Sequence, residues 1–428
     1  MEWVIVFGLV ALLFLGAPIF VVILAATITG FYYGNVELEV IAVELYRIVD
    51  TPLLLSLPLF TFAGYVLSES NTSHRLLNLT RSLFGWMPDG MAIVALVACA
   101  VFTALTGASG VTIVALGALL LPALKKAGYS EKFGTGLVTT SGSLGLLLPP
   151  SIPLILYGII VQQINTGPAF TINELFFAGV VPGLLIIALL AIYTVWANRK
   201  NPIPRIPFVA KDALSAIKDA AWELPMPIFV LGGIFTGFLA VSELAAVTAL
   251  YVLVIEMFIY KEIKWRQLPS VMSESMIMVG GILLILGVSM AFTSYLIDAQ
   301  VPNTLFEWVK QHVDDKLTFL LLLNLFLLIL GAILDIFSAL IIVVPLILPI
   351  AVGYGIHPVH LGIIFLANMQ IGYFTPPVGM NLFIASYRFN KPITEIYSAT
   401  IPFMFVMMAA VLIITYVPEL SLLFIEQK

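Results

Sequence analysis

Two stretches of this 428-residue chain decide its fold: residues 139–153, TTSGSLGLLLPPSIP, and residues 368–381, NMQIGYFTPPVGMN. Each lies between long apolar runs and combines glycine with a Pro-Pro pair. Proline removes a backbone donor and clashes with the preceding helical turn, and glycine lowers the cost of irregular backbone. The sequence therefore predicts a broken helix at about 139–160 and a second one at about 368–386.

The composition around these stretches is that of a membrane protein. Hydrophobic residues make up 61% of the chain and charged residues 10%, whereas a soluble domain has about 25% charged residues. Apolar runs such as Val4–Thr29, Leu317–Ile350 and Ile401–Val417 suit helices that cross a bilayer in about 20 residues, and roughly ten crossings fit the chain. The runs are continuous rather than alternating, which excludes an outer-membrane barrel. We predict an all-α polytopic membrane protein.

The chain also repeats itself. A set of four residues recurs 227 positions later (376 − 149): Pro122, Gly128, Gly145 and Pro149 return as Pro349, Gly355, Gly372 and Pro376. We divide the chain into a first half (1–200), a basic connecting loop (201–221) and a second half (222–428). Duplicated halves with interrupted hydrophobic segments are typical of secondary transporters, whose substrate site lies where the halves meet. We expect the two halves to be inverted relative to each other.

Two further stretches look too interrupted for plain membrane spans. Residues 51–67 contain Pro52, Pro58 and Gly64, and residues 275–297 contain three glycines. Each stretch is interpreted as a re-entrant hairpin, with an ordinary kinked helix as the alternative.

The helix breaks predict a ligand site. Freed backbone groups are tolerated in a bilayer only where they are buried in protein or line a cavity, and there they bind sodium or a carboxylate. The candidate residues for sodium or substrate are Ser109, Ser141, Ser143, Gly145, Pro149 and Pro150 in the first half, and Asp335, Asn368, Gln370, Gly372, Thr375, Pro376, Gly379 and Asn381 in the second. The alternative for each polar side chain is a structural bond to a neighbouring helix.

Asp335 leaves other functions open. An acid inside a long apolar run is a functional candidate, as a cation ligand or a titrating group, but it also suits a structural bond to a helix end. A titrating Asp335 favours a cation/proton antiporter, and an ion channel is a further alternative. The sequence has no nucleotide-binding or nucleophile motif, and His357 and His360 lack acidic or cysteine partners nearby. We therefore expect no enzymatic activity, no cofactor and no transition metal.

Residues 107–128, 141–153 and 371–383 together resemble the large transmembrane subunit of tripartite ATP-independent periplasmic (TRAP) transporters. The resemblance implies an elevator-type, sodium-driven importer in a bacterial inner membrane, and an organic acid such as a C4-dicarboxylate or sialic acid as substrate. It implies two partners, a small four-helix membrane subunit and a periplasmic substrate-binding protein. The net charge of −5 is spread over short loops, so we expect no nucleic-acid partner. The resemblance also implies one ion or substrate site at Ser141, Ser143, Gly145 and the first Pro-Pro pair, and a counterpart at Asn368, Gln370, Thr375 and Gly379.

Overall fold

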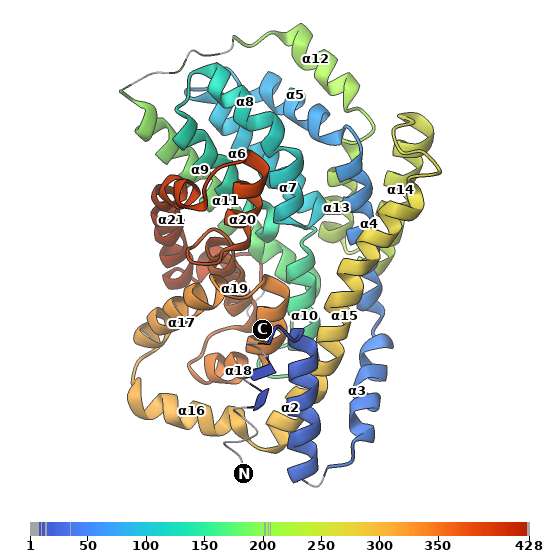
Figure 1. The fold of residues 1–428 in the computed structure, drawn as a ribbon, viewed down its shortest axis with the longest axis vertical. Helices are drawn as coiled ribbons and strands as arrows, with labels where there is room; N and C mark the ends of the chain where they lie inside the picture. Colours follow the sequence, from blue (N-terminus) through green and yellow to red (C-terminus); the bar gives the residue numbers. More distant parts are fainter. Residues whose placement is uncertain are drawn as a thin grey trace.

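The computed structural model describes residues 15–34, 36–200 and 207–425, together with positions 8, 9, 11, 12, 203 and 205. Within these residues every regular element is a helix (Figure 1). The all-α prediction is therefore confirmed. Residues 4–7 of the apolar run Val4–Thr29 lie outside the described residues, and its residues 19–29 belong to helix α2 (Ile19–Gly34).

The elements follow the chain in two series. Those of the first half are α2 (Ile19–Gly34), α3 (Glu39–Val49), η1 (Pro52–Leu55), α4 (Ser56–Glu69), α5 (Thr72–Phe84), α6 (Gly90–Thr106), α7 (Ser109–Ala115), α8 (Gly117–Ala127), α9 (Glu131–Ser141), η2 (Leu144–Leu147), α10 (Ile152–Ile164) and α11 (Ile172–Asn198). After α12 (Ala210–Asp219) come α13 (Pro225–Thr236), α14 (Val241–Val254), the π-helical turn η3 (Ile255–Ile259), α15 (Leu268–Asp298), α16 (Val301–His312), α17 (Lys316–Gly331), α18 (Ile336–Gly353), α19 (Pro358–Gly372), α20 (Met380–Phe389), α21 (Ile393–Tyr416) and α22 (Glu419–Leu422).

Six helical segments of the described chain are long and apolar enough to cross a membrane, and eight if each of two bent pairs is one crossing. The bent pairs are α7 with α8, at 53°, and α9–η2 with α10, at 42°. This is fewer than the roughly ten crossings expected from about 20 apolar residues each. The reason is that other apolar helices, such as α6, α17 and α19, have only 10–17 residues.

At 51–67 and 275–297, where hairpins were expected, the structure has the alternative form, ordinary helices. Residues 275–297 lie inside α15, one helix of 31 residues. Its Gly280 and Gly281 have no atom within 4 Å of where a Cβ would stand, and a glycine inside a helix costs only about 1 kcal/mol. Residues 51–67 form η1 and α4, with Pro52 and Pro58 in their first turns, where a helix tolerates proline because no intrahelical donor is lost.

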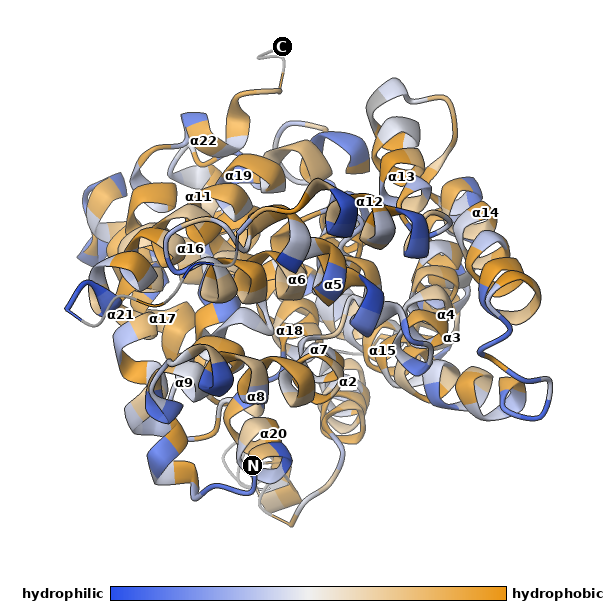
Figure 2. Cartoon of the chain, turned by 90° about the horizontal axis from the view of Figure 1, so that it is seen from above, coloured by the Kyte–Doolittle hydropathy of each residue, from blue (hydrophilic) through white to orange (hydrophobic). Residues whose placement is uncertain are grey.

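The basic connection at 201–221 contains a helix rather than being loop throughout. α12 packs Ala216 and Ala220 against Leu79 of α5. Seen from the end of the molecule where these two helices lie, hydrophilic residues stand out on α12 and α5 among the mostly hydrophobic helices (Figure 2). This end of the molecule is therefore more polar than the helical bundle below it.

The helix boundaries follow the offset found in the sequence. α9 begins at Glu131 and α19 begins 227 positions later at Pro358. Gly128 and Gly355, also 227 apart, both have positive φ, at 105° and 71°. α5 and α16, which stand in corresponding places along the two halves, lie at opposite ends of the molecule (Figure 1). Helices α10 and α19, which belong to the two broken segments, lie near the middle of the fold (Figure 1).

Candidate functional site

The first broken segment follows the predicted pattern of glycine, serine and proline. α9 ends at Ser141, a single 3₁₀ turn follows as η2, and α10 begins at Ile152. Ser151 starts the new helix, because its side chain accepts a hydrogen bond from the Leu154 amide at 3.3 Å. Pro149 and Pro150, joined by a cis peptide bond, are buried between the two helical parts.

The second broken segment has the same outline. α19 ends at Gly372 and α20 begins at Met380, after the cis bond between Pro376 and Pro377. The Gly379 amide donates to the Ala332 carbonyl at 3.2 Å. The Asn381 amide donates to the Tyr373 carbonyl at 2.8 Å. The irregular backbone thus finds partners inside the protein, as a helix break in a bilayer requires.

Matching glycines seat both segments. A Cβ on Gly145 would stand 2.3 Å from the Ala100 carbonyl oxygen and from the Ala104 nitrogen of α6. A Cβ on Gly372, the repeat partner of Gly145, would stand 2.5 Å from the backbone of Gly331 in α17. Only glycine allows so close a backbone approach. Each break is therefore held against the corresponding helix of its own half.

Hydrogen bonds join residues of the two halves at this point. The Ser143 hydroxyl lies 3.3 Å from the backbone carbonyl oxygen of Gln370 and 3.3 Å from that of Thr140, and can donate to either. The Ser109 hydroxyl donates to Asn381 Oδ1 at 2.9 Å, and Asn381 Nδ2 lies 3.5 Å from the Thr139 carbonyl oxygen. All of these side chains are buried. The structure thus brings together four of the predicted polar residues.

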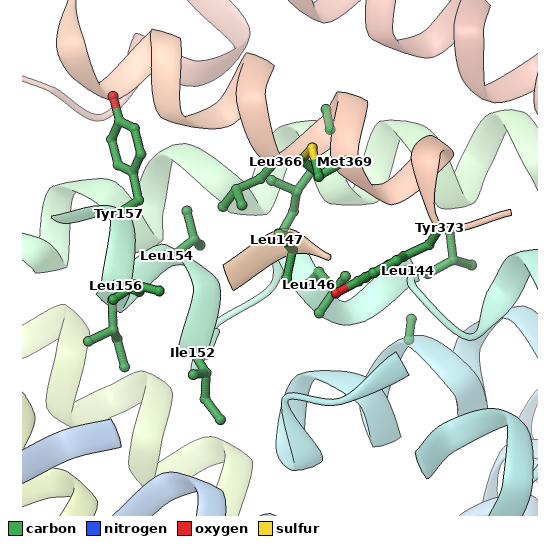
Figure 3. Close-up of a cluster of buried hydrophobic side chains, with 14 of the residues drawn as sticks. Leu144, Leu146, Leu147, Ile152, Leu154, Leu156, Tyr157, Leu366, Met369 and Tyr373 are labelled. Carbon is green, nitrogen blue, oxygen red and sulfur yellow. The ribbon is translucent and has the colours of Figure 1, made fainter. Parts of the chain in front are cut away.

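The surroundings of this junction are apolar. Leu144, Leu146 and Leu147 of η2 lie beside α19, where Met369 and Tyr373 face them (Figure 3). All five side chains are buried. A polar group among them is far from water, so the free-energy cost of leaving it unpaired is high.

Several polar atoms nevertheless lack a partner. Gln370 is 0% exposed, and neither its Oε1 nor its Nε2 has a hydrogen-bond partner. Asn368 Oδ1 and Thr140 Oγ1 are also buried and unpaired. Each such group costs about 1–3 kcal/mol. We name Thr140, Ser143, Asn368 and Gln370, with the Ser109–Asn381 pair, the broken-helix site.

Other predicted residues lie outside this group of contacts. The Thr375 hydroxyl donates to the Ile371 carbonyl of its own segment at 2.8 Å, and Pro376 is half-buried. The Ser141 hydroxyl likewise donates to the Val138 carbonyl, at 3.2 Å. Asp335 accepts hydrogen bonds from the Phe337 and Ser338 amides at 2.9 and 3.0 Å. These bonds match the structural alternative for Asp335, a cap at the start of α18.

The sequence analysis missed Thr140, Asn324 and Thr415. Asn368 Nδ2 donates to Asn324 Oδ1 in α17 at 2.6 Å, and Asn324 Nδ2 donates to Thr415 Oγ1 in α21 at 3.1 Å. Asn324 is the one amide side chain in the apolar helix Lys316–Gly331. A polar residue inside such a helix is a candidate for a functional position, so this signal was present in the sequence.

Charged side chains gather elsewhere. Arg75 of α5 contacts three carboxylates: Glu223 at 2.6 Å, Glu262 at 2.6 Å and Glu256 at 3.3 Å. Its guanidinium also lies 3.9 Å from the centre of the Tyr260 ring. We name these residues, with Thr72, which donates to Glu223 at 2.6 Å, the Arg75 cluster.

The cluster keeps two of its members, Arg75 and Glu262, charged. Burial lowers the pKa of Arg75, but the hydrogen bonds to Glu223 and Glu262 raise it by more. Burial also raises the pKa of Glu262, and the hydrogen bond from Arg75 outweighs it, so the net shift is downward. Both groups are therefore charged at neutral pH, and the cluster ties α5 to the segments around α13 and η3.

The sequence of this chain can be compared with those of known proteins. The family described as the tripartite ATP-independent periplasmic transporter, DctM component, matches residues 6–420. The chain belongs to this family. The C4-dicarboxylate TRAP transporter large permease protein DctM of Rhodobacter capsulatus is 35% identical to this TRAP large subunit, over 99% of this chain and 98% of that protein. The isethionate TRAP transporter permease protein DctMQ of Oleidesulfovibrio alaskensis is 33% identical, over 98% of this chain and 66% of that protein. The ectoine TRAP transporter large permease protein TeaC of Halomonas elongata is 28% identical, over 99% of this chain and 98% of that protein.

A solved structure shares the fold of this TRAP large subunit. The YdaH transporter of Alcanivorax borkumensis, described as having an unusual topology, matches with a TM-score of 0.62 at 14% identity, over 86% of this chain and 85% of that one. The sequence relatives are permease proteins of TRAP transporters. The chain is thus a multi-pass membrane protein of a transport system, as its resemblance implied.

Proposed function

We propose that this TRAP large subunit carries the transport path of a sodium-coupled importer for a small organic acid. The observation that supports the proposal is the chemistry of the broken-helix site. It offers unpaired oxygens on Thr140, Asn368 and Gln370, and an unpaired donor on Gln370 Nε2. Oxygens suit a sodium ion, and an N–H donor suits a carboxylate.

Charge balance supports the coupling. In the part of the chain that the structure describes, no lysine or arginine is fully buried. A carboxylate taken into the site would have no cationic side chain beside it, and a buried unpaired charge is very costly. A sodium ion bound next to the acid offsets that cost, so the two bind together. The membrane potential then contributes about 2.3 kcal/mol for each net charge moved through 100 mV.

We further infer that the two halves form an inverted repeat and that the part holding both breaks moves as an elevator. The matched glycine seats support this, because they fix each break to a helix of its own half. In this proposal the hydrogen bonds of Ser143 and Ser109 keep the two breaks together while this part of the protein moves. The small membrane subunit stays with the large one in the bacterial inner membrane, and a periplasmic binding protein delivers the acid.

The proposal is tested by uptake into proteoliposomes that contain this chain and its small subunit, with the binding protein outside. Labelled succinate, sialic acid, isethionate and ectoine are offered with a sodium gradient or with an equal potassium gradient. We expect saturable uptake of one of these compounds that needs both sodium and the binding protein. Uptake that is equal in potassium, or that proceeds without the binding protein, would reject the proposal.

A further inference from the structure

A buried chain of amide groups leads away from the broken-helix site. Asn368 Nδ2 donates to Asn324 Oδ1 at 2.6 Å and to the Ile364 carbonyl at 2.8 Å. Asn324 Nδ2 donates to the Leu320 carbonyl at 2.9 Å. Asn368 is 0% exposed and Asn324 is 3% exposed, so water does not complete these bonds.

The two carbonyl groups determine which way both amides point. A backbone carbonyl only accepts hydrogen bonds, so each must face an NH₂ group. Turning Asn324 over would place its Oδ1 against the Leu320 oxygen and its Nδ2 against Asn368 Nδ2. Turning Asn368 over would place its Oδ1 against both the Ile364 oxygen and Asn324 Oδ1. The Asn368 side chain is therefore held with its oxygen away from Asn324, and this oxygen is the one without a partner.

Thr415 holds Asn324 from a third helix. Its hydroxyl oxygen lies 3.1 Å from Asn324 Nδ2 and 3.2 Å from Asn324 Oδ1. Thr415 belongs to α21, Asn324 to α17 and Asn368 to α19, and these three helices contact one another. The amide of Asn324 is thus fixed by the packing of three helices rather than by its own helix alone.

We propose that Asn324, fixed by Thr415, is a positioning residue that presents Asn368 Oδ1 to the coupling cation. This inference rests on the proposed function. Residues that orient a ligand from behind change cation affinity when they are replaced, although they do not touch the ion. Asn324 acts in this way because it occupies the donor end of the Asn368 amide and leaves only the acceptor end for the site.

The test measures the sodium concentration that gives half-maximal uptake. Replacing Asn324 by Leu keeps the volume and removes the acceptor, and we expect the half-saturating sodium concentration to rise about tenfold. Thr415→Val keeps the shape and removes the hydroxyl, so a smaller rise is expected. Uptake at saturating sodium, and the substrate concentration for half-maximal uptake there, should stay near the wild-type values.

Thr400→Val is the matched control. Thr400 is buried in the same helix as Thr415, and its hydroxyl bonds to the Ile396 and Tyr397 carbonyls of that helix. Its half-saturating sodium concentration should not change. The rise in melting temperature on adding sodium to the purified complex gives a second readout, since a ligand stabilises the state that binds it. This rise should shrink for Asn324→Leu and persist for Thr400→Val.

Two results would overturn the inference. One is an unchanged half-saturating sodium concentration in both Asn324→Leu and Thr415→Val. The other is an equal loss of uptake at every sodium concentration, which would mean a purely structural role. If Asn324→Leu does not assemble, Thr415→Val decides. Failure of the proposed function is distinguishable, because the wild-type complex would then show no sodium dependence before any variant is compared.

Discussion

The Arg75 cluster and the broken-helix site both place polar groups away from water, with opposite chemistry. In the cluster, ionisable groups pair with one another: the guanidinium of Arg75 lies within 3.3 Å of the carboxyl groups of three glutamates. In the broken-helix site the groups are neutral, and Gln370 has no partner at either end of its amide. The comparison shows that the ion pairs of the Arg75 cluster tie separate segments of the fold together, whereas the neutral amide of Gln370 contributes no bond to the fold.

The largest effect on folding stability is expected for Arg75→Gln. The change leaves the buried carboxylate of Glu223 without its cation, and an uncompensated buried charge costs about 3 kcal/mol. The melting temperature of the purified complex should fall steeply. Arg47→Gln is the control, because Arg47 is half-exposed and pairs with Glu44 of its own helix. Equal melting temperatures for the two variants would contradict the structural role of the cluster.

A smaller effect is expected for Gly145→Ala. The new methyl group would meet the backbone of α6 at 2.3 Å, and overpacking of this kind costs about 1–3 kcal/mol. Because the break itself must shift, sodium-dependent uptake should fall together with the melting temperature. Gly280→Ala provides the comparison, since no atom lies within 4 Å of its Cβ position. A Gly145→Ala complex with wild-type stability and uptake would show that the seat is not needed.

The smallest effect on stability is expected for Gln370→Leu, and this variant sharpens the comparison most. It removes an amide that has no partner, so folding stability should stay level or rise by about 1 kcal/mol. Sodium-dependent uptake should nevertheless fall at least about tenfold, as for other lost ligand contacts. Gln163→Leu is the control: it removes an amide that donates to Thr51 at 3.1 Å, so it should lower stability and spare uptake. A Gln370→Leu complex that is less stable but takes up substrate normally would mean that Gln370 supports the fold and does not bind a ligand.

The helix breaks could be predicted from the sequence because their cause is local. Glycine and proline act on the residues next to them, and Gly145, Gly372 and the two Pro-Pro pairs lie where the structure has irregular backbone after α9 and α19. The same residues misled at 275–297, where Gly280 and Gly281 face open space and the helix simply continues through them. A glycine in a sequence does not reveal whether it is needed for a bend or for a close contact.

Long-range pairing could not be foreseen in the same way. The bond from Asn368 to Asn324 joins residues 44 positions apart on different helices, and no local pattern specifies which helices pack together. Asp335 shows the converse case. Its position in an apolar run favoured a functional role, but whether it caps α18 depends on where that helix begins, and helix ends are the least predictable part of a sequence interpretation.

The paired glycine seats have a consequence for the two sides of the site. Because Gly145 and Gly372 fix the backbone of each half in the same way, the residues beside them can differ without disturbing that shape. The first half offers the hydroxyls of Ser141 and Ser143, and the second offers the amides of Asn368 and Gln370 at the matching positions. The same backbone shape, used twice, therefore holds two unlike sets of polar side chains, and a symmetric frame encloses an asymmetric interior.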